Sequence, residues 1–217
     1  MAEPAASSTA VRLLGLPISV YTRIARLALE EKRVEYVFDE VDVFAKGGPP
    51  ADYLQLNPFG RIPGLLHGDF CVYETAAICR YVDEAFAGPS LQPRDPAARA
   101  RMAQIIGVLD HYAYRPMVRD IYVERVESEI PDEARIAAAL PRVETVLRQL
   151  DDWHAGSAFL AGDSLTLADL HAYPMLRYLA ATFEGDTLLG ARPRLYDWFT
   201  NMRARPSVIA TPYPAVD

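Results

Sequence analysis

The chain has 217 residues, of which 51% are hydrophobic, so it is long enough to bury one large core or two smaller ones. Its formal net charge is −7 at pH 7 without a long basic run, which argues against nucleic acid as a partner, because phosphate binding needs clustered positive charge. No apolar run is long enough to cross a bilayer, and the first ten residues lack the pattern of a signal peptide, so we expect a short disordered tail and no membrane contact.

The first third of the chain mixes strand and helix patterns. Residues 11–15 form a short apolar run typical of a buried strand, and residues 19–33 carry apolar positions at helical spacing. Residues 34–43 alternate apolar and acidic side chains, which predicts a half-exposed strand. A short helix at 51–56, two strands and a helix at 74–86 follow, so the predicted order is β-α-β, a loop with a short helix, then β-β-α.

The two strands of the β-β-α segment, RIPGLL and DFCVY, are predicted to form a hairpin with a turn at residues 67–69. Pro63 stands at the entrance of the first strand, although proline has no N–H for a sheet ladder. If the Ile62–Pro63 bond is cis, the backbone N–H and C=O of Ile62 face outward, where an extended peptide ligand can pair with them. An ordinary turn proline is the alternative.

The rest of the chain predicts helices only. Three prolines and one glycine in residues 87–96 indicate a linker, and helical periodicity then covers residues 97–127, 132–155, 166–184 and 194–204. Pro141 and Pro174 lie inside these patterns and should kink or divide their helices. Thr166 and Asp169 have the spacing of a capping box, with Leu165 and Leu170 as a hydrophobic staple.

Two segments of the first region are candidates for ligand binding. Glu74 and Thr75 begin a helix, where free N–H groups attract an anion such as a ligand carboxylate, and Glu74 can meet a ligand ammonium group. Arg61 can pair with a second carboxylate. A plain N-cap pair and a solvated surface arginine are the structural alternatives.

Ser19 lies between the first strand and the first helix, so its hydroxyl points along the helix N-terminus. The positive electrostatic field at a helix N-terminus favours a thiolate over a neutral thiol. A hydrogen bond to a charged group contributes roughly 1.5–3 kcal/mol. At about 1.36 kcal/mol per pKa unit, such a bond lowers the pKa of a bound thiol by roughly one to two units from its usual value of about 8.5. A simple N-cap serine is the alternative.

Other motifs are weak. The four histidines show no metal-ligand spacing, so no metal is expected, and no nucleotide-binding or G-x-S-x-G motif is present. Cys71 and Cys79, the only cysteines, predict two buried free thiols and a reducing, cytoplasmic setting.

The stretches GLPISVYTR (15–23), NPFGRIPGL (57–65), CVYET (71–75) and LAGDSLTLADLHAYP (160–174) together resemble the cytosolic glutathione transferase family, and among its classes the phi type. The resemblance covers residues 11–210. It implies a thioredoxin-like α/β domain with a mixed sheet at residues 11–86, a linker at 87–96 and an all-helical domain at 97–217. It also implies glutathione as co-substrate and nucleophilic attack by its thiolate on a hydrophobic small-molecule electrophile, as in detoxification.

The resemblance assigns roles to the candidate residues. Ser19 falls on the catalytic serine that stabilises the glutathione thiolate. Ile62, before cis-Pro63, supplies the backbone contact to the cysteinyl part, and the Glu74–Thr75 pair holds the γ-glutamyl group. Arg61 faces the glycine carboxylate. The candidates for the electrophile pocket in the helical domain are Tyr114, Met117, Val118 and Ile121.

Some features depart from the phi pattern. Gly48–Pro49 stands where a basic pair is usual, with Lys46 the only amine nearby, so the affinity for glutathione is expected to be modest. Tyr21 or Thr22 can share or take the role of Ser19. Family members are usually homodimers, which we also expect here. The alternative functions are a non-catalytic interaction or stress-regulatory module, or a glutathione-dependent isomerase, dehalogenase or peroxidase.

Overall fold

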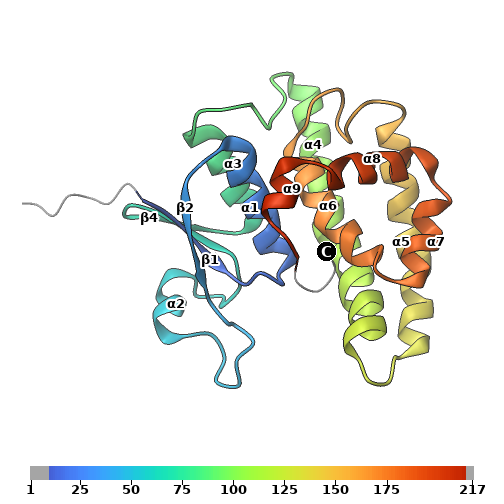
Figure 1. Ribbon diagram of the computed structural model, residues 1–217, viewed down its shortest axis with the longest axis horizontal. Coiled ribbons are helices and arrows are strands. Elements are labelled where there is room, and N and C mark those ends of the chain that lie inside the picture. Colours follow the sequence, from blue (N-terminus) through green and yellow to red (C-terminus); the bar gives the residue numbers. More distant parts are fainter. Residues whose placement is uncertain (1–9, 214–217) are drawn as a thin grey trace, which may run out of the picture. The chain divides into compact units, whose positions relative to one another are not determined.

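The computed structural model describes residues 10–213, which form two compact units (Figure 1). The first unit contains residues 10–89 together with 211–213, and the second contains residues 90–210. The division falls inside the predicted linker. Residues 211–213 were predicted to belong to the helical domain, but they group with the first unit. The predicted N-terminal tail lies, except for residue 10, outside the described residues.

The first unit is built on a four-stranded mixed sheet in the order β2-β1-β3-β4. Strands β1 and β2 are parallel, whereas β1–β3 and β3–β4 are antiparallel. The strands are β1 (Val11–Gly15), β2 (Tyr36–Glu40), β3 (Gly64–His67) and β4 (Phe70–Tyr73). This arrangement confirms the predicted thioredoxin-like fold of the N-terminal region.

Three helices accompany the sheet: α1 (Val20–Lys32), α2 (Ala51–Leu56) and α3 (Thr75–Ala85). Helices α1 and α3 contact each other, and α2 lies apart from them (Figure 1). Leu14 of β1 packs with Tyr53 of α2, while its neighbour Leu13, which points to the opposite face, is fully buried. Both faces of the sheet are therefore covered.

A buried ion pair joins the ends of α1 and α3. The Nζ atom of Lys32 lies 3.1 Å from Oδ1 of Asp83 and donates also to the carbonyl oxygens of Asp83 and Pro89, at 2.9 and 3.1 Å. Because all three contacts satisfy the buried ammonium group, they offset part of the cost of removing it from water.

Neither cysteine is bonded to another cysteine. Cys79 is fully buried, as predicted, whereas Cys71 is only half-buried, and burial raises the pKa of the Cys71 thiol. The prediction of two buried thiols was therefore right for one of them.

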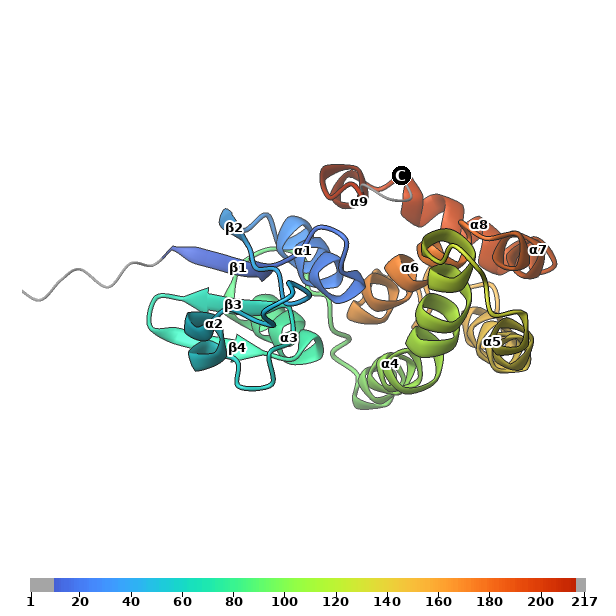
Figure 2. The ribbon, with the colours of Figure 1, turned by 90° about the horizontal axis from the view of Figure 1, so that it is seen from below.

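The second unit is helical throughout the described residues. Its elements are α4 (Pro96–Val108), η1 (Leu109–Ala113), η2 (Arg115–Glu127), α5 (Glu133–His154), α6 (Leu167–Leu179), α7 (Phe183–Gly190), α8 (Pro193–Arg203) and α9 (Pro206–Ala210). Every residue of α6 except Arg177 is buried, and α6 contacts η2, α4, α7 and α8 (Figure 2). Helix α6 is therefore the centre of the helical core.

The helical run from α4 to η2 contains wide turns. The N–H groups of Tyr114 and Ser128 donate to the carbonyl oxygens five residues earlier, at Leu109 and Val123, as in a π-helix. Pro116, just inside η2, has no N–H to donate, and a wider turn gives its ring room. The helix predicted over residues 97–127 is thus observed, with a π-helical second half.

The prolines do not divide their helices. Helix α5 runs through Pro141 and α6 through Pro174, because the packing of the buried residues of each helix outweighs the loss of one backbone hydrogen bond. The predicted helix 166–184 instead ends at residue 179, where Gly185 of α7 folds back so closely that a Cβ atom would lie 1.9 Å from the Leu179 carbonyl oxygen. A glycine, not a proline, marks this break.

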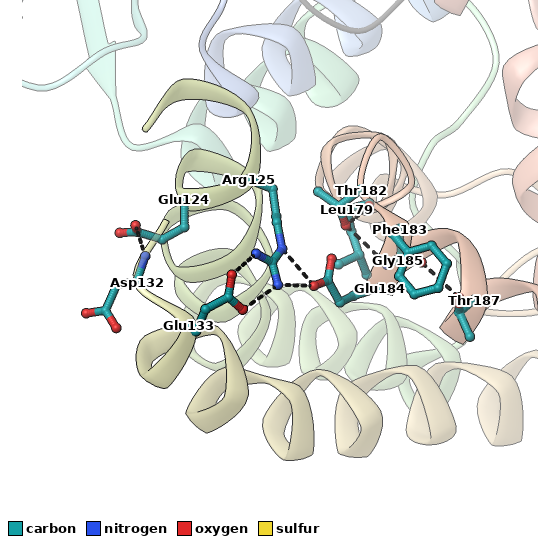
Figure 3. A network of polar contacts seen from close by, with 10 residues as sticks. All are labelled: Glu124, Arg125, Asp132, Glu133, Leu179, Thr182, Phe183, Glu184, Gly185 and Thr187. Carbon is teal, nitrogen blue, oxygen red and sulfur yellow. Dashed lines mark hydrogen bonds and ion pairs between the residues drawn. The ribbon is translucent and has the colours of Figure 1, made fainter. Parts of the chain in front are cut away.

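A polar network joins η2, α5 and α7. The guanidinium group of Arg125 points between the carboxylates of Glu133 and Glu184 (Figure 3). It donates to Oε2 of Glu133 at 2.8 Å and to Oε1 of Glu184 at 2.7 Å. One side chain thereby connects three elements of the helical unit.

Candidate active site

The strand register of the first unit brings the predicted ligand-binding segments to one end of the sheet. In the antiparallel pairs, Leu14 lies opposite Gly64, and Gly64 lies opposite Tyr73. The segment that follows β1, the segment that precedes β3 and the segment that follows β4 therefore meet at the same end. These segments carry Ser19, Arg61–Pro63 and Glu74–Thr75, respectively.

Ser19 is the N-cap of α1. Its backbone is extended, with φ −84° and ψ 124°, and its Oγ accepts from the N–H of Thr22 at 3.2 Å. The side chain is half-buried, and the first turn of α1 holds no acidic residue. The hydroxyl can still donate its own proton, so Ser19 can serve as the cap and as a donor to an anion.

The two neighbouring hydroxyls that were alternatives to Ser19 differ in exposure. Thr22 is fully buried, and its Oγ1 lies so close to Gly15 that a Cβ atom added there would be 2.4 Å away. Tyr21 is half-buried. A ligand sulfur has no access to Thr22 in this arrangement, which leaves Ser19 and Tyr21.

The segment before β3 contains a cis peptide bond between Ile62 and Pro63. The preceding carbonyl oxygen, of Arg61, accepts from the Tyr53 hydroxyl at 2.5 Å and from Nδ2 of Asn57 at 2.7 Å. Tyr53 and Asn57 are both 2% exposed, and burial raises the pKa of the Tyr53 phenol, which therefore keeps its proton as a donor.

The two supporting residues were missed in the sequence analysis. Asn57 opens the stretch NPFG, four residues before Arg61, and an asparagine at a turn is a local signal that could have suggested it. Tyr53 has no such signal, because only the packing of α2 on the sheet brings its hydroxyl to the Arg61 carbonyl.

Glu74 has an unusual backbone conformation. Its φ of 69° and ψ of 116° lie outside the regions that residues with a side chain normally adopt. As the N-cap of α3 it makes no side-chain cap hydrogen bond, and its side chain is exposed. Strained residues of this kind cluster at functional sites. Thr75, next in the chain, is 8% exposed and begins α3.

The positive charges predicted for this end of the sheet are exposed. Arg61 and Lys46 are both solvent-accessible. The Lys46 loop follows β2, whose last residue, Glu40, lies beside Gly15, so this loop begins at the same end of the sheet. Gly48 has a φ of 78° and donates its N–H to the Ala45 carbonyl at 2.8 Å, which makes a turn where the phi pattern has its basic pair.

The four predicted pocket residues lie in the second unit with different exposures. Met117 and Ile121 are fully buried, Val118 is 5% exposed and Tyr114 is half-buried. Met117 and Ile121 are four residues apart on η2, a helix that packs against α5 and α6. They therefore present no surface to a ligand in this structure, and Tyr114 is the most accessible of the four.

A groove of about 850 Å³ lies elsewhere in the second unit, between the α4–η1 region and α5. Its lining includes Tyr112, Arg115, Arg142 and Trp153, and none of the four predicted pocket residues.

The described residues hold no group of three or more His, Cys, Asp or Glu side chains that could bind a metal ion. None of the helices between residues 10 and 213 has the length and apolar character that crossing a membrane requires.

Comparisons with known proteins agree with this architecture. Residues 13–90 match the model of the glutathione S-transferase N-terminal domain, and residues 109–206 match that of the C-terminal domain. Glutathione S-transferase 3 of Zea mays is 30% identical over 213 residues, which cover 94% of this chain and 96% of the relative.

Solved structures show the same similarity. Glutathione transferase F7 from Populus trichocarpa has a TM-score of 0.81 and 27% identity, covering 93% of this chain and 97% of its own. Glutathione S-transferase I from maize, solved in complex with an atrazine glutathione conjugate, has a TM-score of 0.81 and 26% identity, covering 93% and 96%.

A thioredoxin-like unit followed by a helical unit is thus the architecture that this chain shares with glutathione transferases. The chain belongs to the glutathione S-transferase family, and its plant relatives are of the phi class, as the resemblance predicted.

Proposed function

We propose that this protein is a glutathione transferase that binds glutathione at the end of the sheet formed by the segments of Ser19, Ile62 and Glu74. The observation that carries the proposal is the register of β1, β3 and β4, which brings these three segments together. Family membership supports the same ligand, and glutathione S-transferase I from maize was solved with a glutathione conjugate.

Each segment supplies one kind of contact. The uncapped N-terminus of α3 and the Thr75 hydroxyl suit the carboxylate of the γ-glutamyl group, and the exposed Glu74 carboxylate suits its ammonium group. The Ile62 backbone pairs with the cysteinyl residue in the manner of an added strand. The exposed Arg61 faces the glycine carboxylate, without the basic pair that Gly48–Pro49 replaces.

Ser19 supports the chemical step. The hydroxyl donates a hydrogen bond to the sulfur, and the N-terminus of α1 adds a favourable field, so the thiol loses its proton to solvent near neutral pH. With an aryl halide, the thiolate forms a carbon–sulfur bond, and the halide leaves with the electron pair of the broken bond.

Tyr114 is the pocket candidate with the most exposed surface for a hydrophobic electrophile, and the biological role would be detoxification.

A direct test is retention on immobilised glutathione, followed by a conjugation assay with a generic aryl halide. We expect retention, elution by free glutathione and conjugation above the uncatalysed rate. A chain that binds neither glutathione nor its conjugates would instead be an interaction module. Retention without conjugation, together with isomerase, dehalogenase or peroxidase turnover, would show a different glutathione chemistry.

We also propose a homodimer in the cytoplasm. The free thiols Cys71 and Cys79 suit a reducing compartment. Phe70 on β4 is 48% exposed, and Tyr112, in the groove of the helical unit, is 65% exposed. A second copy of the chain would bury such exposed rings.

Replacing Tyr112 by glutamate should therefore weaken the dimer, because the charge would have to be desolvated in the interface. Analytical ultracentrifugation would show the mass falling from two chains to one chain of 24.1 kDa. Ile130→Glu is the control, since Ile130 is 86% exposed and lies neither on β4 nor among the residues that line the groove. A wild-type chain that sediments as a monomer at micromolar concentration would contradict the proposal.

A further inference from the structure

The last residue that the structure describes, Tyr213, is buried in the first unit beside the loop that carries Ser19. Tyr213 is 1% exposed, and its hydroxyl donates to the backbone carbonyl oxygen of Ile18 at 3.0 Å. The guanidinium group of Arg23 lies 4.7 Å from the centroid of its ring, a cation–π contact between the tyrosine and helix α1.

This hydrogen bond acts on the peptide unit that precedes Ser19. The C=O of Ile18 and the N–H of Ser19 belong to one planar peptide group. The Ser19 N–H donates to the Leu16 carbonyl at 3.0 Å, while the Ile18 carbonyl accepts from Tyr213. The N–H and the C=O of this peptide plane are therefore both hydrogen-bonded.

The other side of Ser19 is held by the helix. Its carbonyl oxygen accepts from the N–H of Arg23 at 3.0 Å, and its Oγ accepts from the N–H of Thr22. The peptide plane before Ser19 and the first turn after it together fix the direction of its Cα–Cβ bond. Among the residues that hold Ser19 in place, Tyr213 comes from a distant part of the sequence, 195 residues after Ile18.

We propose that Tyr213 is a positioning residue for Ser19: by holding the Ile18–Ser19 peptide plane, it aims the serine hydroxyl at the sulfur of bound glutathione. The inference rests on the proposed function and adds to it a residue from the opposite end of the chain. Tyr213 itself touches neither the thiol nor the electrophile, and it acts only through Ser19.

Replacing Tyr213 by phenylalanine tests this role, because it removes the hydroxyl and keeps the ring over Arg23. We expect kcat at neutral pH to fall about two- to tenfold, the range for loss of one neutral hydrogen bond. The KM for glutathione should stay within about twofold, since the contacts at Ile62, Glu74 and Thr75 lie on other segments. With glutathione saturating, the pH midpoint of kcat/KM for the aryl halide should move upward. The difference in rate between the variant and the wild type should vanish at alkaline pH, where the thiol ionises without help.

A double-mutant cycle separates positioning from general structural damage. If Tyr213 acts through Ser19, then Tyr213→Phe has no further effect on kcat in a Ser19→Ala background. The matched control is Tyr122→Phe, because Tyr122 is also fully buried and its hydroxyl has no hydrogen-bond partner. This control should behave as wild type in kcat and pH midpoint, and thermal unfolding should show both single variants folded.

The outcomes distinguish this inference from the function on which it rests. Equal losses from Tyr213→Phe with and without Ser19, or a loss without a shift in the pH midpoint, would overturn the positioning role. An active wild type with an unaffected Tyr213→Phe variant would overturn the inference alone. A wild type that does not conjugate glutathione would overturn both.

Discussion

Replacing Ser19 by alanine is expected to lower kcat/KM for a generic aryl halide at least tenfold, while glutathione still binds. In the proposed site the Ser19 hydroxyl donates to the sulfur, so its loss removes a hydrogen bond to an anion of roughly 1.5–3 kcal/mol. That free energy corresponds to a factor of about ten to one hundred in the thiolate population at neutral pH. Steady-state kinetics and calorimetric titration with glutathione would measure the two effects separately.

The control must account for the second role of Ser19, which caps α1. Loss of an N-cap costs about 1 kcal/mol of stability by itself. Asp95→Ala removes a comparable cap, since Oδ2 of Asp95 accepts from the N–H of Ala98 at 2.8 Å at the start of α4. This variant should keep full activity at a similar cost in stability. Unchanged turnover in Ser19→Ala would move the catalytic role to Tyr21.

The largest effect on stability is expected from Asp169→Ala. The Asp169 carboxylate is fully buried and accepts four hydrogen bonds, from Leu160 N and Thr166 N at 2.9 Å, Thr166 Oγ1 at 3.0 Å and Trp198 Nε1 at 2.9 Å. Alanine leaves these donors without an acceptor in the core, at about 1–3 kcal/mol each when they are not rescued by water. Because such terms are not additive, we expect the free energy of unfolding to fall by roughly 3–5 kcal/mol.

Urea unfolding followed by tryptophan fluorescence would measure this change. Asp163→Ala is the matched control, since Asp163 is an exposed aspartate in the preceding loop, and its free energy of unfolding should differ from wild type by less than about 0.5 kcal/mol. The free energy of unfolding of Asp169→Asn should lie between those of Asp169→Ala and Asp163→Ala, because one oxygen acceptor remains. A loss below about 1 kcal/mol in Asp169→Ala would show that the core relaxes around the missing carboxylate.

The capping box shows what the sequence could and could not predict. Thr166 and Asp169 are three residues apart, so their reciprocal contact follows from local spacing and was predicted correctly. The contacts of Asp169 with Leu160 and Trp198 depend on how the chain folds back on itself, and nothing in the local pattern indicates them. The prolines were expected to kink or divide their helices, and at Pro141 and Pro174 the division does not occur, because tertiary packing keeps both helices continuous.

The candidate site divides in the same way. Ser19, Pro63 and Glu74 each stand at a recognisable boundary between a strand and the next segment, so the resemblance could locate them. Their meeting at one end of the sheet depends on the register, and the supports from Tyr53 and Tyr213 depend on packing between distant segments.

The candidate pocket on η2 was limited by a different property of sequence patterns. Helical spacing groups residues on a face, but it does not say which face is covered. Met117 and Ile121 proved fully buried, while Tyr114 keeps some exposed surface.

The proposed function requires that this protein lower the pKa of the glutathione thiol at the end of the sheet that holds Ser19. The most direct measurement is a pH titration of the thiolate by its ultraviolet absorption, with the protein saturated by glutathione. We predict a midpoint about one to two units below the value of about 8.5 for a free thiol, returning toward that value in Ser19→Ala. A midpoint equal to that of free glutathione, in a chain shown to bind it, would show that Ser19 and the N-terminus of α1 do not activate the thiol.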